Sequence, residues 1–89
     1  MMGYSLAPTK LFLKKLGKLD HSITLELEKK LDAIRLNPLS SEHRMHHLHN
    51  YFRVCVRNFR VIYEVNDSRI ILLDIIRRNE GYGQYARGG

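Results

Sequence analysis

Apolar residues in the first part of the chain recur every three or four positions, which is the period of a helix that buries one face. Before this pattern, residues 4–6 form a possible short strand that ends near Pro8. Thr9 is a good N-cap residue, because its hydroxyl can accept a hydrogen bond from the first helical turn, and it predicts a helix over residues 9–16. Gly17 then ends this helix.

A second helix follows after a short connection. Its start is marked by Asp20 or Ser22, which are both good N-cap residues, and the Asn-Pro pair at residues 37–38 ends it. Four apolar residues at spacings of three or four share its buried face: Ile23, Leu27, Leu31 and Ile34. Two neighbouring helices with so short a connection predict an αα-hairpin.

The hydrophobic period changes to two in the second half of the chain. Residues 52–57 and 59–65 alternate between apolar and polar side chains, and Asn58 can form a tight turn between them. The polar run at residues 66–68 is a second turn. Residues 70–76 are almost wholly apolar, which predicts a central strand covered on both faces. The pattern therefore predicts an α+β protein with an antiparallel meander.

The size and composition of the chain allow one small domain. Its length of 89 residues excludes a large cofactor domain such as a dinucleotide fold. Its hydrophobic fraction of 44% is ordinary for a globular protein. We expect a single domain over residues 1–89, with the Gly-rich residues 83–89 as a flexible tail. The single cysteine excludes an internal disulfide framework. No apolar run approaches the ~18 residues of a membrane span, and no signal peptide is recognised, so we expect a cytoplasmic protein without membrane contact.

The chain is basic, and its two kinds of cation are separated. The formal net charge is +6, from 15 Lys and Arg against 9 Asp and Glu. Every lysine lies at or before Lys30, every arginine lies at or after Arg35, and residues 43–63 contain no acidic side chain. Lysines on a helix indicate a solvated face, whereas arginines among aromatic residues favour recognition of flat or forked anions.

The strongest candidate for chemistry is the set of arginines on the predicted meander. Arg53 and Arg57 flank Cys55 on one face of a strand, Arg60 begins the next strand, and an arginine pair at residues 77–78 ends the last one. Ends of antiparallel strands can converge on one concave face, where guanidiniums would bind a phosphodiester backbone. Five aromatic residues could stack on bases: Tyr51, Phe52, Phe59, Tyr82 and Tyr85. The alternative is the solvated polar face of a one-sided sheet.

Other candidate groups give weaker signals. Four histidines in the run HRMHHLH could bind a metal: His43, His46, His47 and His49. We expect them instead to add pH-dependent charge to the anion-binding face or to lie on a loop, and we predict no metal and no cofactor. Cys55 lacks a nucleophile motif. Asp74 is expected to pair with a neighbouring arginine rather than to form a catalytic carboxylate pair with Glu64.

Residues 46–82, which read HHLHNYFRVCVRNFRVIYEVNDSRIILLDIIRRNEGY, resemble the core of the RelE/ParE toxin superfamily. The N-terminal pair of helices also fits, so the resemblance covers nearly the whole chain. The family pattern falls on an ordered set of positions: Leu48, Tyr51, Arg53, residues 59–63, residues 66–67, Arg77, Arg78 and Tyr82. Members are the toxin halves of bacterial and archaeal type II toxin–antitoxin modules. The resemblance implies a twisted antiparallel sheet with two N-terminal helices packed on one face, in the order β-α-α-β-β-β.

For the RelE branch, the resemblance implies ribosome-dependent, metal-independent cleavage of mRNA in the A site, by attack of the RNA 2′-OH on the adjacent phosphate. Arg53 and Arg60 would hold the scissile phosphate. Arg78 would stabilise the transition state or the leaving oxygen, and Tyr82 would stack on a base or transfer a proton. Further RNA contacts are expected from Arg57, Arg77, His47, His49 and Tyr85. Three residues depart from the family pattern: Cys55 replaces a second basic residue, Arg57 a turn glycine and Arg77 a histidine.

Two other functions remain open within this superfamily. One is a ParE-like toxin that poisons DNA gyrase without cleaving RNA, and the other is a degenerate member that binds only its antitoxin and operator DNA. All three imply a RelB-like antitoxin, acidic or amphipathic, that wraps the helices or the basic face of the sheet. The RelE branch adds mRNA and the ribosome as partners, with operator DNA contacted only through the antitoxin complex.

Overall fold

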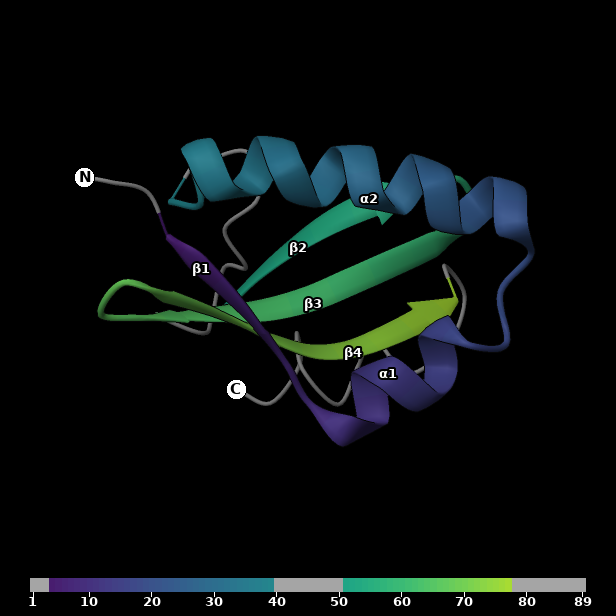
Figure 1. Ribbon diagram of the computed structural model, residues 1–89, viewed down its shortest axis with the longest axis horizontal. Helices are drawn as coiled ribbons and strands as arrows, with labels where there is room; N and C mark the ends of the chain where they lie inside the picture. The colour runs from purple at the N-terminus through teal and green to yellow at the C-terminus, as the bar shows by residue number, and fades with distance from the viewer. Residues whose placement is uncertain (1–3, 40–50, 78–89) are drawn as a thin grey trace.

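The computed structural model describes residues 4–39 and 51–77, which form one four-stranded sheet and two helices (Figure 1). The elements are, in chain order, β1 Ser5–Pro8, α1 Lys10–Leu16, α2 His21–Leu36, β2 Tyr51–Val56, β3 Phe59–Asn66 and β4 Arg69–Arg77. This confirms the predicted α+β class and the β-α-α-β-β-β order. Neither helix in the described part of the chain has the length and apolar character needed to cross a membrane.

The four strands lie in the order β1-β4-β3-β2, so β4 is a central strand as predicted. β2, β3 and β4 form the expected antiparallel meander. β1 pairs with β4 in parallel, from Ser5 opposite Arg69 to Pro8 opposite Leu72, so the sheet is mostly antiparallel with one parallel edge strand. Because β1 runs parallel to β4, the chain leaves β1 and enters α1 beside β4. Pro8 is compatible with the strand because an edge strand bonds to only one neighbour.

Each helix packs its apolar face against the sheet. α1 contacts mainly β4 and buries Phe12, whereas α2 contacts mainly β2 and buries Leu27, Leu31 and Ile34. Figure 1 shows the two helices over different parts of the sheet, with α2 across β2 and α1 beside β4. The predicted αα-hairpin is therefore wrong as a packing unit, because the sheet covers the apolar residues that a hairpin would bury between its helices.

Tyr63 on β3 connects the sheet to the end of α2. Its side chain is fully buried, and its ring stacks on that of Phe52 with centroids 5.3 Å apart and planes 12° apart. The hydroxyl donates a hydrogen bond of 3.0 Å to the carbonyl oxygen of Pro38, just beyond α2. Burial raises the pKa of Tyr63 above its ordinary value.

Replacing Tyr63 with phenylalanine should lower the free energy of unfolding by about 1 kcal/mol at neutral pH, because the ring stays while the Pro38 carbonyl loses its donor. The raised pKa means that the unfolded chain loses this proton first as the pH rises above about 10. The stabilising contribution is therefore complete below pH 10 and declines above it. Urea denaturation between pH 8 and 11 should show a steeper alkaline loss for the wild type than for Y63F, and equal slopes would contradict this assignment.

Candidate functional site

Two of the predicted arginines lie on the face of the sheet opposite the helices. Side chains that alternate with the core residues of β2, β3 and β4 point to this side. The strand register aligns the residues of this face in two rows. One row is Cys55, Arg60 and Ile76, and the other is Arg53, Ile62 and Asp74. We call these two rows the outer face; its residues are Arg53, Cys55, Arg60, Ile62, Asp74 and Ile76. Arg53 and Arg60 are diagonal neighbours, a relation that places two residues about 7–8 Å apart, with their Cβ atoms somewhat closer.

Arg60 is held close against the sheet. The residue is half-buried and its Nε atom is enclosed. Its Nη1 donates a hydrogen bond to the Sγ atom of Cys55, which lies directly opposite on β2. Arg53 is also half-buried, one position along the same face. Two guanidiniums this close produce a positive potential suited to a phosphate, with planar donors that match its oxygens.

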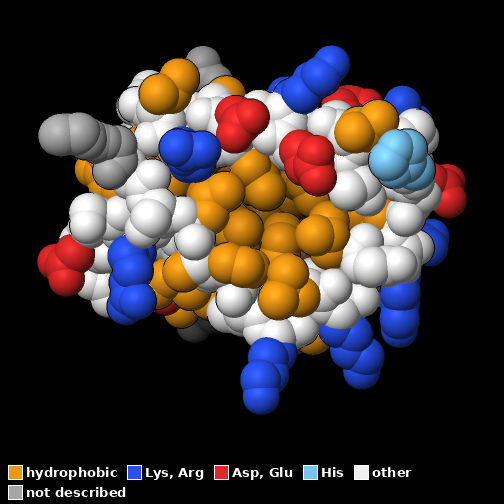
Figure 2. Space-filling view, viewed as in Figure 1, with side chains coloured by type: hydrophobic (Ala, Val, Ile, Leu, Met, Phe, Trp, Pro, Cys, Tyr) orange, Lys and Arg blue, Asp and Glu red, His pale blue; other side chains and the backbone are white. Residues whose placement is uncertain are grey.

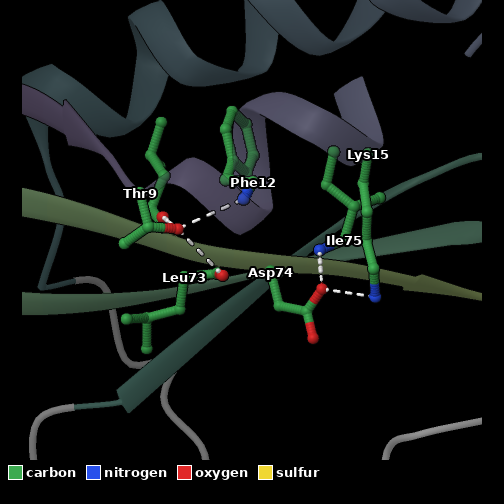
Figure 3. A network of polar contacts seen from close by, with 7 residues as sticks. Thr9, Phe12, Lys15, Leu73, Asp74 and Ile75 are labelled. Atoms are coloured by element: carbon green, nitrogen blue, oxygen red, sulfur yellow. Dashed lines mark hydrogen bonds and ion pairs between the residues drawn. The ribbon is translucent and has the colours of Figure 1, made fainter. Parts of the chain in front are cut away.

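A buried carboxylate lies at the β4 end of the outer face. Asp74 is 2% exposed, and its Oδ1 lies 2.7 Å from the Nζ of Lys15 on α1 (Figure 3). The same oxygen accepts a hydrogen bond of 2.7 Å from the backbone N–H of Ile75. The ion pair is therefore made with a lysine from α1, whereas an arginine was expected. Lys15 lies far from Asp74 in the sequence, so no local pattern indicated it.

A β-bulge explains why Asp74 turns away from the core. Ile62 pairs with Asp74 and the next residue, Tyr63, pairs with Leu72, so Leu73 is an extra residue in β4. The Thr9 hydroxyl donates to the carbonyl oxygens of Leu72 and Leu73, at 2.9 and 3.2 Å (Figure 3).

The same Thr9 oxygen accepts a hydrogen bond of 3.2 Å from the backbone N–H of Phe12, which confirms the predicted N-cap. One side chain thus connects the start of α1 to the irregular part of β4.

Arg57 does not share a face with Arg53, contrary to the prediction. β2 ends at Val56, and Arg57 lies in the following turn with a φ of 54°. Its Nε donates a hydrogen bond of 2.9 Å to Glu26 Oε1 on α2, on the helix side of the sheet. The left-handed backbone conformation rotates the side chain out of the strand alternation.

Arg77 also lies on the helix side. It is paired with Phe59 at the end of β4, and its guanidinium carbon lies 5.8 Å from the centre of the Phe59 ring. The extra residue in β4 shifts the alternation by one, so Ile75 faces the core, Ile76 the outer face and Arg77 the helices. The expected convergence of Arg77 with Arg53 and Arg60 is therefore wrong.

A basic pocket opens on the helix side between α1 and the adjoining ends of β3 and β4. Its volume is about 210 Å³. Three cations and three apolar residues line it: Lys15, Lys18, Arg77, Leu19, Phe59 and Ile75. Figure 2, viewed from this side, shows hydrophobic side chains gathered in the hollow between α2 and α1, with basic side chains along the lower rim. The pocket combines an apolar floor with positive charge at its edge.

Several predicted residues lie outside the described parts of the chain. They are Arg78, Tyr82, Tyr85, His47 and His49, together with the rest of the histidine run. Within residues 4–39 and 51–77, no three side chains of the His, Cys, Asp or Glu type are grouped as metal ligands would be. The roles assigned to these five residues stay predictions.

Comparisons with known families and with solved structures both find toxins. A family model described as the ParE toxin of the type II toxin–antitoxin system parDE matches residues 6–82. No curated protein matches the chain by sequence. Similar solved structures, in contrast, are toxins that their descriptions name RelE.

Three of these structures illustrate the likeness. A free-state Escherichia coli RelE with two arginines replaced has a TM-score of 0.85 at 19% identity, covering 96% of this chain and 94% of that one. The RelE–RelB complex of E. coli gives 0.80 at 20% identity, covering 86% and 99%. The Methanococcus jannaschii RelB–RelE complex gives 0.66 at 27% identity, covering 89% and 98%. At these identities the likeness shows the fold.

Proposed function

This chain belongs to the RelE/ParE superfamily of type II toxin–antitoxin toxins, and from that premise we propose that it is a RelE-like endoribonuclease that cleaves mRNA in the ribosomal A site. The observation that carries the proposal is the pair Arg53 and Arg60, which are diagonal neighbours on the outer face of the sheet. Both occupy positions that the RelE pattern assigns to the scissile phosphate. Such an enzyme would act in the cytoplasm, where mRNA and ribosomes are.

The proposed reaction is attack by the RNA 2′-OH on the neighbouring phosphate, which forms a 2′,3′-cyclic phosphate and releases a 5′-hydroxyl. Negative charge builds up on the phosphate oxygens in the transition state. Donors fixed before the reaction stabilise that charge more effectively than water does. Arg60, with one nitrogen anchored on Cys55, and the neighbouring Arg53 are such donors. Arginine stays protonated at neutral pH, so neither residue is the base that accepts the 2′-OH proton.

Residues outside the described parts of the chain complete the proposal. We assign Arg78 to the transition state or leaving oxygen and Tyr82, or Tyr85 in its place, to base stacking or proton transfer. His47 and His49 are assigned to further RNA contacts. Arg57 and Arg77 are less suited to the same contacts, because both point to the helix side.

The test is incubation of the full-length protein with a defined mRNA, with and without ribosomes stalled at a known codon. Primer extension should show a cut within the A-site codon when ribosomes are present and an intact message when they are absent. Intact mRNA in both reactions would overturn the endoribonuclease proposal.

A second function, poisoning of DNA gyrase, is favoured by the family model itself, whose description names the ParE toxin. A supercoiling assay with purified gyrase separates the two functions. Inhibition of gyrase without mRNA cleavage would support the ParE-like alternative. A protein that binds its antitoxin but neither cleaves mRNA nor inhibits gyrase would be the degenerate member.

We further propose that a RelB-like antitoxin covers the helix side. Two solved relatives are complexes of RelE with RelB. In this chain the hollow between the helices offers apolar surface, and the pocket beside it adds the cations Lys18 and Arg77 (Figure 2). An acidic, amphipathic segment complements both features. Operator DNA would then be contacted through the antitoxin complex.

Reversing the charge of Lys18 with K18E should slow association with the antitoxin by about tenfold, because charges at the rim of an interface act mainly on the encounter rate. The measurement is surface plasmon resonance with the protein encoded by the adjacent open reading frame. The matched control is K10E, an exposed lysine in the first turn of α1 that does not line the pocket. An equal effect of both reversals would show that only net charge matters.

A further inference from the structure

Cys55 and Arg60 form a cross-strand pair at the β2 edge of the outer face. They are directly opposite in the register of β2 and β3, and Arg60 Nη1 donates a hydrogen bond to Cys55 Sγ. Cys55 is exposed and is a free thiol. No nucleophile or metal motif surrounds Cys55 in the sequence. The strand register, in contrast, brings the Cys55 sulfur next to the Arg60 guanidinium.

We propose that Cys55 is a positioning residue for Arg60, an inference that rests on the endoribonuclease proposal and extends it. An arginine side chain has about 2 kcal/mol of rotamer entropy to lose when it is fixed in one place. Arg60 is half-buried and its Nε atom is enclosed, so the sheet already restricts part of this side chain. The hydrogen bond to Cys55 adds a fixed position for Nη1 at the end of the side chain.

The chemical nature of the acceptor matters as much as its place. Arg53 lies diagonally across from Arg60, so the two positive charges repel each other. A carboxylate at position 55 would hold Arg60 but would also neutralise the charge that attracts a phosphate. A thiol accepts the hydrogen bond while adding no negative charge in its neutral form. Cys55 therefore fixes the geometry of Arg60 and preserves the positive potential of the outer face.

Two substitutions separate this role from a structural one. C55A removes the acceptor and should lower the single-turnover cleavage rate on ribosomes by about tenfold, with a smaller effect on the concentration at half-saturation. C55S keeps a neutral acceptor and should stay within about threefold of the wild type. Because Cys55 is exposed, neither change should alter the melting temperature noticeably.

The closing experiment adds a readout that does not depend on activity. NMR relaxation of the Arg60 side-chain Nε–Hε group should report an ordered guanidinium in the wild type and C55S, and a more mobile one in C55A. Equal Arg60 order in all three proteins would overturn the positioning role, whatever the cleavage rates. If the wild type cleaves no RNA while Arg60 still becomes mobile in C55A, the endoribonuclease proposal fails and the positioning role stands.

Discussion

Replacing Arg60 with alanine is expected to slow cleavage of ribosome-bound mRNA by at least about 100-fold. Removing one preorganised donor from a site that stabilises a developing oxyanion typically costs a factor of that size. Arg60 is anchored on the outer face, since Cys55 accepts one of its N–H groups. The measurement is the single-turnover rate on ribosomes stalled with a defined A-site codon. The cleavage rate of R60K should fall between those of the wild type and R60A, because a lysine restores the charge but not the planar set of donors.

The matched control for this result is R35A. Arg35 is an exposed arginine on α2, and it pairs with Asp32 at 3.5 Å on the surface, a contact worth little to stability. R35A removes one positive charge from the opposite side of the molecule, so it should cleave at the wild-type rate within about twofold. A comparable loss in R35A and R60A would show that net charge, rather than the outer face, governs the reaction.

Replacing Phe12 with alanine should lower the free energy of unfolding by about 3–5 kcal/mol. Phe12 is 1% exposed and is the buried residue of α1, a helix of seven residues. A helix this short has little stability of its own and depends on packing. Small domains are stable by only about 5–15 kcal/mol, so F12A should unfold at a much lower urea concentration than the wild type.

The control for F12A is L13A, the next residue along α1, which is 50% exposed. L13A removes a large apolar side chain that faces solvent, and it should change the free energy of unfolding by less than about 1 kcal/mol. Urea denaturation followed by circular dichroism measures both. If L13A were as destabilising as F12A, α1 would not pack against β4 through Phe12 as described.

The sequence predicted the elements well because their patterns are local. The spacing of Ile23, Leu27 and Leu31 identified α2, and the alternation in β2 and β3 placed Arg53 and Arg60 on polar positions of neighbouring strands. Thr9 was recognised as a cap because that hydrogen bond spans only three residues. These features depend on side chains close together in the chain, which a single sequence contains in full.

The misplaced residues depend on features that the sequence pattern does not show. One extra residue at Leu73 moves Arg77 to the helix side and Asp74 away from the core. An uninterrupted strand would place Asp74 in the core and Arg77 on the outer face. The positive φ at Arg57, in the turn between β2 and β3, likewise turns its side chain to the helix side. The pairing of Lys15 with Asp74 requires α1 and β4 to be neighbours, which follows from the parallel placement of β1.

The decisive measurement is the chemical identity of the RNA ends made by the purified full-length protein on ribosomes with a programmed A site. If the outer-face arginines stabilise attack by the 2′-OH, the upstream fragment carries a 2′,3′-cyclic phosphate, the downstream fragment carries a 5′-hydroxyl, and the cut lies within the A-site codon. The variant R53A/R60A should yield neither fragment above background. Intact mRNA with the wild-type protein, accompanied by inhibition of DNA gyrase, would contradict the proposed function.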